Sequence, residues 1–579
     1  GPYTQITQEN MPGVRGFSSM YGLTHTPGTW VAGMQLNKGA GSVVNGFESI
    51  AGQINVELRK PETAERLYLN LYANEGRRVE ANANVAHRFN DKWSTALLLH
   101  AKQNGLQLSH TEAAFMDRNG DNFMDMPMEQ DFIALNRWKY IGSGRLRMQA
   151  GVKAIYSDHI GGELSDHNME FPHNHFWAMQ LNTRRLEGFS KIGLVFPERP
   201  WRSVGLQLSA VNHEQDSYFG MRRYLNQQRS TYANLVYQGI LGNTNHTFRT
   251  GASFQADWYE EQLNVERFDR NEMVPGAYFE YTYQHLNKFG LVAGIRADHH
   301  NLFGAFVTPR LHLRYAPREK TVFRLSGGRG QRTANILAEN NGLFASSRNI
   351  VIQGEEAGLP YGLRPEVAWN FGFNFTQYFT LDYREGSFNL DLYRTDFVNQ
   401  IVMDLENPRE VRFYNLEGQS YSNSFQAQVE YELVKRVDVR LAYRWFDVHT
   451  TYSGELLAKP LVSPHRAFLN IAYETRSNWS FDYTVNWQGS KRLPNTKANP
   501  EPFQRADRSP AFVIMNAQVS KKWGERFELY AGGENLLNFK QADPIVAAAD
   551  PFGPYFDASM VWGPIFGRNV YLGLRYRVE

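Results

Sequence analysis

The stretch Leu67-Tyr68-Leu69-Asn70-Leu71-Tyr72 alternates strictly, and after the turn at Glu75-Gly76 the same rhythm resumes in Val79-Glu80-Ala81-Asn82-Ala83-Asn84-Val85. A period of two places successive side chains on opposite faces, which predicts two β-strands joined as a hairpin. The pattern returns in residues 204–210 and 437–445, and no helical period competes with it over comparable lengths. The chain is therefore predicted to be all-β.

The composition restricts how these strands can be arranged. Of 579 residues, 42% are hydrophobic and 14% aromatic, and the mean hydropathy is −0.51. The sequence contains no run of about 20 predominantly apolar residues, which a membrane-crossing helix needs. A membrane β-barrel fits, because its lipid-facing and lumen-facing residues alternate and its aromatic residues form two interfacial girdles.

Connections between the expected strands alternate in length. Short ones at Asn90-Asp91-Lys92 and Gly142-Ser143-Gly144 are followed by long polar ones at 104–130 and 158–175. Short turns on one side and long loops on the other are typical of outer-membrane barrels. If strands begin near residue 62, we predict a transmembrane antiparallel β-barrel of about 22 strands, at roughly 23 residues per strand and connection.

The last expected strand, Val570 to Val578, supports closure of the barrel. Its apolar set faces lipid while Arg575 and Arg577 face inward, and pairing with the first strand leaves no exposed edge. A soluble sandwich or propeller would alternate too, but a propeller predicts a repeat of roughly 40–50 residues, and we find none.

Several function classes are disfavoured by the residues themselves. The formal charge of +2 argues against a nucleic-acid partner. The absence of cysteine excludes disulfides and thiolate chemistry. Gly327-Gly328-Arg329-Gly330 lacks the Gly-Lys-Ser/Thr of a phosphate-binding loop, and neither a His-Glu-x-x-His motif nor a nucleophile elbow is present. We therefore predict that the chain is not an enzyme.

One segment resembles the end of the plug domain in TonB-dependent outer-membrane receptors: Lys38-Gly39-Ala40-Gly41-Ser42-Val43-Val44-Asn45-Gly46-Phe47-Glu48-Ser49-Ile50-Ala51-Gly52-Gln53-Ile54-Asn55-Val56. In that family a lysine-glycine turn, a small-residue stretch and a Gly-x-Ile-Asn strand lead into the barrel. Further matches follow in the family's order, at Val14-Arg15-Gly16, Phe306-Val307-Thr308-Pro309-Arg310-Leu311, Arg324-Leu325-Ser326, Leu363-Arg364-Pro365-Glu366 and Glu534-Asn535-Leu536-Leu537-Asn538. The loops and plug look most similar to receptors from Bacteroidota.

The resemblance implies a domain plan and partners. Residues 1–61 would be the C-terminal part of the plug, and residues 62–579 the barrel. The chain would be a monomer in the outer membrane of a Gram-negative cell, surrounded by its lipid and energised by TonB with its inner-membrane motor. No signal peptide or TonB-contacting box is present, so we expect further plug sequence before Gly1. The chain also ends in Val578-Glu579 instead of the family's usual aromatic residue.

The implied function is import of a scarce nutrient, with a metal or metal chelate, either a ferric siderophore or copper, as the favoured cargo. By analogy alone, the stretch from Met20 to Trp30 would contribute to binding. The alternatives are a passive porin-like channel and a surface binding protein without transport. A porin has no reason to carry the plug-like segment 38–56, so that segment discriminates between the classes.

Two sets of residues are candidate metal ligands. The first has oxygen ligands spaced as in calcium loops, and predicts a calcium ion in an outer loop, with no other cofactor; the simpler alternative is an acidic turn held by Asx hydrogen bonds. It consists of Asp117, Asn119, Asp121 and Asp125.

The second set combines imidazole and thioether groups, which suit copper, while imidazole alone suits zinc, iron or haem. The alternative is that these side chains are polar filler and hydrophobic packing under the loops, where Met116, Met124, Met126 and Met128 also lie. The set consists of His159, His167, Met169, His173, His175 and Met179, with His299 and His300 at another strand top.

Arginines expected to face the lumen are Arg440, Arg444, Arg575 and Arg577. They could attract an anionic ligand, but such residues more often pair with carboxylates on neighbouring strands or on the plug. We interpret them as structural.

Overall fold

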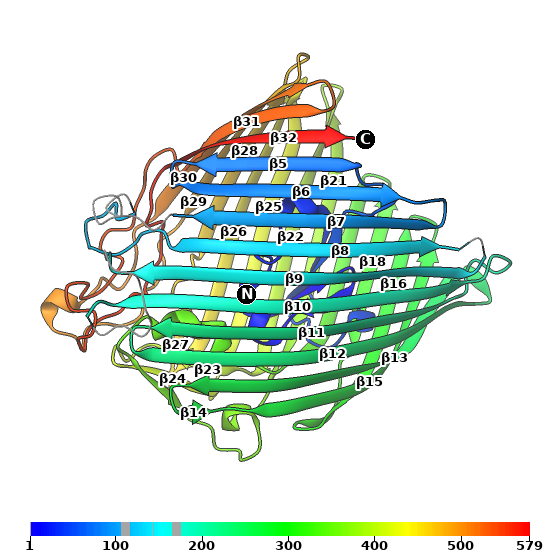
Figure 1. The fold of residues 1–579 in the computed structure, drawn as a ribbon. Coiled ribbons are helices and arrows are strands. Elements are labelled where there is room, and N and C mark those ends of the chain that lie inside the picture. The colour runs from blue at the N-terminus through cyan, green and yellow to red at the C-terminus, as the bar shows by residue number, and fades with distance from the viewer. Residues whose placement is uncertain (1, 106–115, 143, 165–174) are drawn as a thin grey trace.

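The computed structural model describes residues 2–105, 116–142, 144–164 and 175–579, and in this part of the chain 22 antiparallel strands close into a barrel (Figure 1). The predicted fold class is confirmed. The strands are β5 (Leu67–Asn74), β6 (Arg78–Arg88), β7 (Trp93–Asn104), β8 (Met128–Ile141), β9 (Leu146–Gly162), β10 (Ala178–Val195), β11 (Ser203–Phe219), β12 (Arg222–Leu241), β13 (Asn243–Leu263), β15 (Arg270–His285), β16 (Phe289–His300), β18 (Arg310–Arg318), β19 (Thr321–Arg332), β21 (Glu366–Leu381), β22 (Arg384–Asn399), β25 (Ser420–Val434), β26 (Val437–Tyr452), β28 (His465–Glu474), β29 (Trp479–Gln488), β30 (Phe512–Trp523), β31 (Phe527–Glu534) and β32 (Asn569–Val578).

Three short strands extend the outer ends of the barrel, and the ring bypasses them through direct pairing of their neighbours. They are β14 (Glu266–Arg267), β17 (Gly304–Val307) and β27 (Glu455–Ala458).

The ring is closed by its first and last strands, as predicted. β32 pairs with β5 from Val578 opposite Leu67 to Tyr571 opposite Asn74. Leu572 is exposed on the outer face, whereas Arg575 points inward and bonds Glu528 on β31 at 2.8 Å. Closure therefore leaves no barrel strand with an unpaired edge in the lipid.

The two ends of the barrel differ in the length of their connections, as expected. One end has tight turns such as 319–320, 382–383 and 435–436, and the other has loops such as 333–365 and 535–568. We call these the short-turn end and the loop end. Two loop-end connections, 75–77 and 220–221, are also short.

The predicted loop 158–175 starts later than expected. β9 continues to Gly162, because its hydrogen-bond ladder with β10 extends as far as Gly162 opposite Ala178. His159 consequently lies in a strand.

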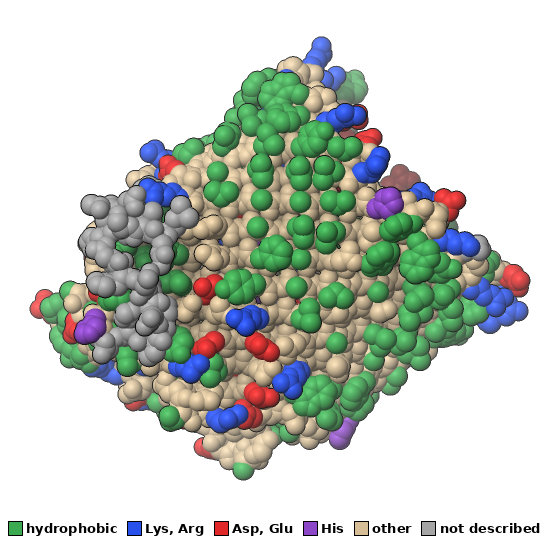
Figure 2. Space-filling view, in the orientation of Figure 1, with side chains coloured by type: hydrophobic (Ala, Val, Ile, Leu, Met, Phe, Trp, Pro, Cys, Tyr) green, Lys and Arg blue, Asp and Glu red, His purple; other side chains and the backbone are tan. Residues whose placement is uncertain are grey.

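The outer surface carries the apolar side chains that a lipid-facing barrel needs. Figure 2 shows hydrophobic side chains distributed across the outer face of the strands. Leu235, Leu325 and Leu441 are each about half exposed there, and exposed tryptophans such as Trp93 and Trp479 flank the short turns. Among the described residues, no helix is long and apolar enough to cross a membrane.

A small sheet lies inside the barrel, with the start of the chain (Figure 1). Its order is β2 (Met11–Val14), β1 (Thr4–Gln8), β4 (Gly52–Leu58) and β3 (Val31–Lys38), with β1 parallel to β4. The 3-10 helices η1 (Gly16–Tyr21), η2 (Gly28–Trp30) and η3 (Val43–Asn45) connect it. We call residues 2–58 the insert. Its Trp30 is fully buried in one core with Leu58, Leu98 and Leu135.

The loop end is covered by two long connections, 333–365 and 400–419, which we call the lid. They contribute η4 (Ala338–Phe344), η5 (Pro360–Gly362) and a sheet of β20 (Asn349–Ile352), β24 (Glu410–Asn415) and β23 (Ile401–Asp404). A further helix, η6 (Glu501–Phe503), lies in another outer loop. The lid packs in one hydrophobic core with Phe17 of the insert, Trp177 and Phe556.

The lipid-facing assignment predicts an asymmetric response to charge. Leu441→Lys, on the outer face a few residues above the turn 435–436, should lower the free energy of unfolding by about 2–4 kcal/mol. Ala442→Lys, its lumen-facing neighbour, should have a much smaller effect. Urea titration of both variants in lipid vesicles measures the difference, and equal losses would contradict the assignment.

Candidate functional site

A cavity of about 510 Å³ lies between the insert and the lid. The insert contributes its floor, and the lid and the upper barrel wall enclose it. Its lining includes Tyr3, Arg15, Met20, Arg332, Tyr452 and Lys459. We call this cavity the chamber.

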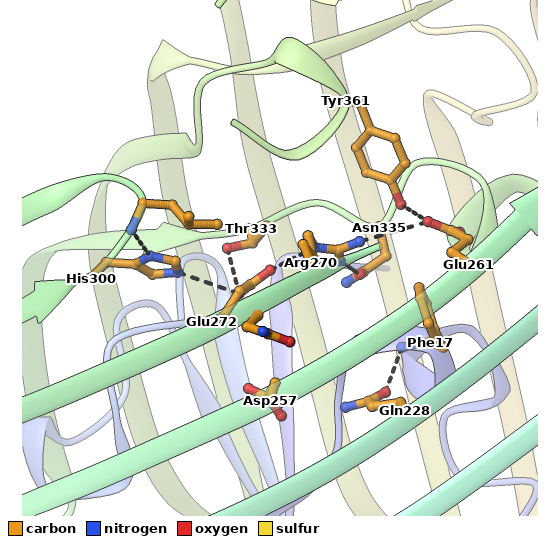
Figure 3. Close-up of polar contacts among 12 residues, drawn as sticks. Phe17, Gln228, Asp257, Glu261, Arg270, Glu272, His300, Thr333, Asn335 and Tyr361 are labelled. Carbon is orange, nitrogen blue, oxygen red and sulfur yellow. Dashed lines mark hydrogen bonds and ion pairs between the residues drawn. The ribbon is translucent and has the colours of Figure 1, made fainter. Parts of the chain in front are cut away.

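The insert is anchored to the wall beside the chamber by a buried ion pair. Arg15, in the Val14-Arg15-Gly16 segment, bonds Asp257 on β13 and lies 3.5 Å from Glu48. The Asp257 side chain is fully buried and also accepts a hydrogen bond from Ser230 at 2.5 Å. The backbone N–H of Phe17 donates to Gln228 at 2.9 Å, as Figure 3 shows. The insert is thus held through specific polar contacts.

Arg270 at the start of β15 joins the wall to the lid (Figure 3). Its Nε donates to Glu272 at 2.8 Å, and its guanidinium bonds Asn335 of the lid and lies 4.1 Å from the centre of the Tyr259 ring. The side chain of Arg270 is only 6% exposed. Glu272 also accepts from Thr333 of the lid at 3.1 Å. The two sides of the chamber therefore share one charged network.

Tyr361 fastens the lid to the same network. Its hydroxyl donates to Glu261 (Figure 3). Glu261 also accepts a hydrogen bond from Tyr224 at 2.6 Å. Burial, and second the negative charge of Glu261, raise the pKa of Tyr361 well above its usual value, so the hydroxyl stays a donor. Tyr361 has φ of 56°, an unfavourable backbone conformation for a tyrosine. Local strain at this contact must be offset by packing of the lid.

The start of the described chain forms another part of the chamber. The hydroxyl of Tyr3 donates to Glu366 at 2.9 Å and accepts from Gln400 at 2.6 Å. Arg332 bonds Glu339 and lies 3.5 Å from Glu366. Arg332 therefore serves two carboxylates, Glu339 and Glu366.

Lys459 also lines the chamber, but it differs from Arg332 in its contacts. Its ammonium makes no hydrogen bond or ion pair with the described residues. Burial lowers the pKa of Lys459. The negative charge of Glu366 opposes this effect of burial. The amine of Lys459 is therefore available to a ligand, and an anionic ligand would favour its charged form.

The predicted calcium ligands lie in a turn in which backbone N–H groups occupy their oxygens. Asp125 accepts from Arg118 at 2.6 Å. Asp117 accepts from Gly120 at 2.7 Å and Asn122 at 2.9 Å, and Asp121 from Phe123 at 2.9 Å. Asn119 both donates to Asp121 and accepts from its backbone. This is the Asx arrangement weighed as the simpler alternative; the calcium site stays a prediction.

Among the described residues, the predicted soft-metal ligands do not lie together. His167, Met169 and His173 lie outside the described residues, and His175 is exposed. His159 contacts Asp131 at 2.9 Å and Ser157 at 3.0 Å. Met179 packs against the lid core.

His299 and His300 point to opposite faces of β16. His300 is buried and contacts Glu272 at 3.3 Å, while His299 is exposed. Four methionines of the neighbouring loop, Met116, Met124, Met126 and Met128, pack with Leu164. No group of three or more His, Cys, Asp or Glu residues in the described part of the chain could hold a metal ion. Metal binding by this set stays a prediction.

Sequence reasoning identified some chamber residues and missed others. Met20, within the Met20–Trp30 stretch chosen by analogy, lines the chamber, and Arg15 was marked by its motif. The residues that join the lid to the wall beside the chamber were also missed, namely Arg270, Glu261 and Tyr361. They lie where strands pass into irregular loops, and no spacing pattern connects them. Only the length of the lid loop 333–365 signalled a functional element.

Comparison with known proteins assigns this barrel to a family. Residues 59–536 match the family model "TonB dependent receptor-like, beta-barrel". The chain therefore belongs to the TonB-dependent receptor family, whose members are outer-membrane transporters and not enzymes. This confirms the predicted family, the outer-membrane location and the absence of an enzymatic role.

Solved structures share the fold at low identity. A mutant of the ferric enterobactin receptor PfeA from Pseudomonas aeruginosa is 13% identical with a TM-score of 0.74, and the match covers 99% of this chain and 90% of that one. The siderophore receptor PirA from Acinetobacter baumannii gives 12% identity, a TM-score of 0.74 and coverage of 99% and 90%. P. aeruginosa FpvA, bound to a pyoverdine–iron complex, gives 11%, 0.69, 99% and 79%. Among curated proteins, none matches the sequence.

Loss of the buried anchor should loosen the insert. Arg15→Leu leaves the Asp257 carboxylate buried without its partner, which should cost about 3–5 kcal/mol. Arg223→Leu, which removes an exposed pair with Asp216, should cost less than about 1 kcal/mol. Hydrogen exchange of residues 2–58 in the full receptor measures how far each variant destabilises the insert. Equal protection of the insert in the two variants would contradict the anchoring role.

The acidic turn should respond to pH. Burial raises the pKa of Asp125 to about 6. Because the folded pKa exceeds the unfolded one, the turn should lose stability as pH rises from about 4 through about 6, and stay constant above. Hydrogen exchange of residues 116–127, corrected for intrinsic rates, should show about tenfold lower protection at high pH, absent in Asp125→Asn. Identical pH profiles would argue against this behaviour.

Proposed function

We propose that the protein imports an iron chelate of the siderophore class, captured whole in the chamber and moved inward with energy supplied by TonB and its inner-membrane motor. The observation that carries this proposal is the chamber itself, enclosed between an insert and a lid that are joined by the hydrogen bond from Gln400 to Tyr3. Its position allows a ligand to contact both elements at once.

The chemistry of the lining favours a complete chelate over a bare metal ion. Among the described residues that line the chamber none is histidine; they offer tyrosines, guanidinium groups, carboxylates and the ammonium of Lys459. The hydroxyl, guanidinium and ammonium groups among them can donate hydrogen bonds to the oxygen atoms of an organic chelator. The likeness to receptors described as binding ferric enterobactin and pyoverdine supports the same choice. Copper remains the second candidate, through the predicted soft-metal set.

Residues 1–61 are proposed to act as the C-terminal part of the plug. Its wall contacts are largely ionic: besides Arg15, Glu9 lies 3.1 Å from Arg137 and 3.8 Å from Lys191. Arg310 donates to the carbonyl oxygens of Gly41 and Ser42 at 2.9 and 2.7 Å. Such contacts can be exchanged for water when the insert moves. A passive porin would gain nothing from an anchored insert that fills its lumen.

Narrowing the chamber should weaken binding of the chelate. Met20→Trp adds volume to a residue of the lining, and Met221→Trp makes the same change in the short connection 220–221, outside the lining. We expect at least tenfold weaker binding for Met20→Trp and an unchanged value for Met221→Trp. The measurement is calorimetry of the full receptor in detergent with ferric enterobactin, ferric pyoverdine, ferric citrate and Cu²⁺.

The two cargo classes give different outcomes in this experiment. Binding of an iron chelate that Met20→Trp weakens supports the proposal. Tight binding of Cu²⁺ alone, or chelate binding that is equal in both variants, would overturn it.

A further inference from the structure

Three of the four lumen arginines singled out in the sequence have carboxylate partners, and the fourth has none. Arg440 lies 2.6 Å from Glu430, and Arg575 and Arg577 lie 2.8 and 3.4 Å from Glu528. These three fit the structural interpretation. Arg444 makes no recorded ion pair among the described residues; its guanidinium lies 3.8 Å from the centre of the Phe446 ring.

Arg444 instead stands directly opposite another cation. The register of β26 and β28 pairs Arg444 with Arg466. Both face the lumen, because Tyr443 and Trp445 occupy the exposed outer face on either side of Arg444. Directly opposed residues have Cβ atoms about 4.5–5.5 Å apart, and like charges in such pairs destabilise the sheet. Arg466 has no recorded hydrogen bond or ion pair in the described part of the chain.

A third cation, Lys491, lies just beyond the loop end of the neighbouring strand β29. It is only 8% exposed, its ammonium donates to the carbonyl of Trp562, and it lies 5.4 Å from the centre of the Phe512 ring. Burial, and second the positive charge of Arg466, lower the pKa of Lys491. Lys491 therefore lies within electrostatic range of Arg466.

The nearest carboxylates in this region are occupied elsewhere. Asp391, in the same row across β25, lies 2.5 Å from Lys38 of the insert and accepts from Asn374 at 2.8 Å. Glu406 of the lid is paired with Arg492 at 2.7 Å. The charge of Asp391 also attracts Arg444 but is shared with Lys38, so the repulsion between Arg444 and Arg466 is only partly offset, and an anionic ligand would relieve it.

We propose that Arg444 and Arg466 form an anion-binding station on the lumen wall, with the buried charge of Lys491 nearby. It takes a ligand with clustered anionic oxygens, such as a carboxylate chelate or a phosphate. Gln426 and Gln488 flank the two arginines in register and add amide donors. Gln426 also lines a cavity of about 830 Å³ near the short-turn end, beside the insert residues Leu36 and Lys38. The station therefore borders the path that an imported ligand would follow after leaving the chamber.

This inference deepens the proposed function and rests on it only for the identity of the cargo. The test compares the full receptor with Arg444→Gln/Arg466→Gln, and with Arg440→Gln as the matched control on the same strand. Calorimetry at low salt uses pyrophosphate, ferric citrate and the cationic chelate ferrioxamine B as probes. We expect at least tenfold weaker binding of pyrophosphate and ferric citrate to the double variant, no change for ferrioxamine B, and no change with Arg440→Gln.

Thermal unfolding in detergent separates a binding role from a structural one. Without added anion, Arg466→Gln should raise the melting temperature, because it removes a repulsion that is only partly offset; a structural arginine would have the opposite effect. Pyrophosphate should raise the melting temperature of the wild type and not of the double variant. The proposed station would be ruled out if the double variant bound pyrophosphate as tightly as the wild type. A melting temperature of Arg466→Gln below that of the wild type would also rule it out.

The outcome for the station is distinguishable from that for the proposed function. Chelate binding that responds to Met20→Trp but not to the double variant would eliminate the station alone. Pyrophosphate binding that the double variant loses, in a receptor that binds no iron chelate, would support the station and eliminate the proposed cargo.

Discussion

Closure of the backbone hydrogen-bond ring is the constraint on which the rest of the structure depends. Within lipid an unpaired N–H or carbonyl group costs several kcal/mol, so the strand edges must meet. Pairing of β32 with β5 meets this requirement, and it fixes which face of every strand is turned to lipid. The alternation of the sequence then places polar side chains inside. A lumen lined in this way can hold an insert through ion pairs and can hold water where the insert is absent.

The fold was predictable because its information is local. Strict alternation, as in Leu67 to Val85, fixes strand and face together, and the terminal strand fixes closure. The chamber was only partly predictable. Arg15 belongs to a recognisable segment, but its partner Asp257 is separated from it by most of the first half of the barrel. Tyr361 and Glu261 meet only because the lid folds back over the wall, and nothing in either neighbourhood encodes that contact.

The register between strands explains why the sequence could not predict the partners of the lumen arginines. The face of a strand on which a side chain lies alternates from one residue to the next. The sequence alone therefore assigned both Arg440 and Arg444 to the lumen. Their partners depend on which residue of the next strand lies opposite, and a shift of register changes every pair. In the structure Arg440 meets Glu430, whereas Arg444 meets Arg466. Two residues of the same type, four positions apart, thus acquire opposite electrostatic environments.

The two boundaries of the chamber differ in what holds them closed. The lid is held largely by burial of apolar surface around Phe344 and Phe413. Opening the lid would expose this surface to water, at a free-energy cost of about 25 cal/mol for each Å² exposed. The insert is held both by the buried ionic contacts of Arg15 and Glu9 and by apolar burial of Trp30 against Leu98 and Leu135. Phe17 of the insert packs in the same core as Phe344 and Phe413, so lid and insert share a contact. Ligand binding in the chamber can act on the lid, a force can act on the insert, and movement of either element disturbs this shared core.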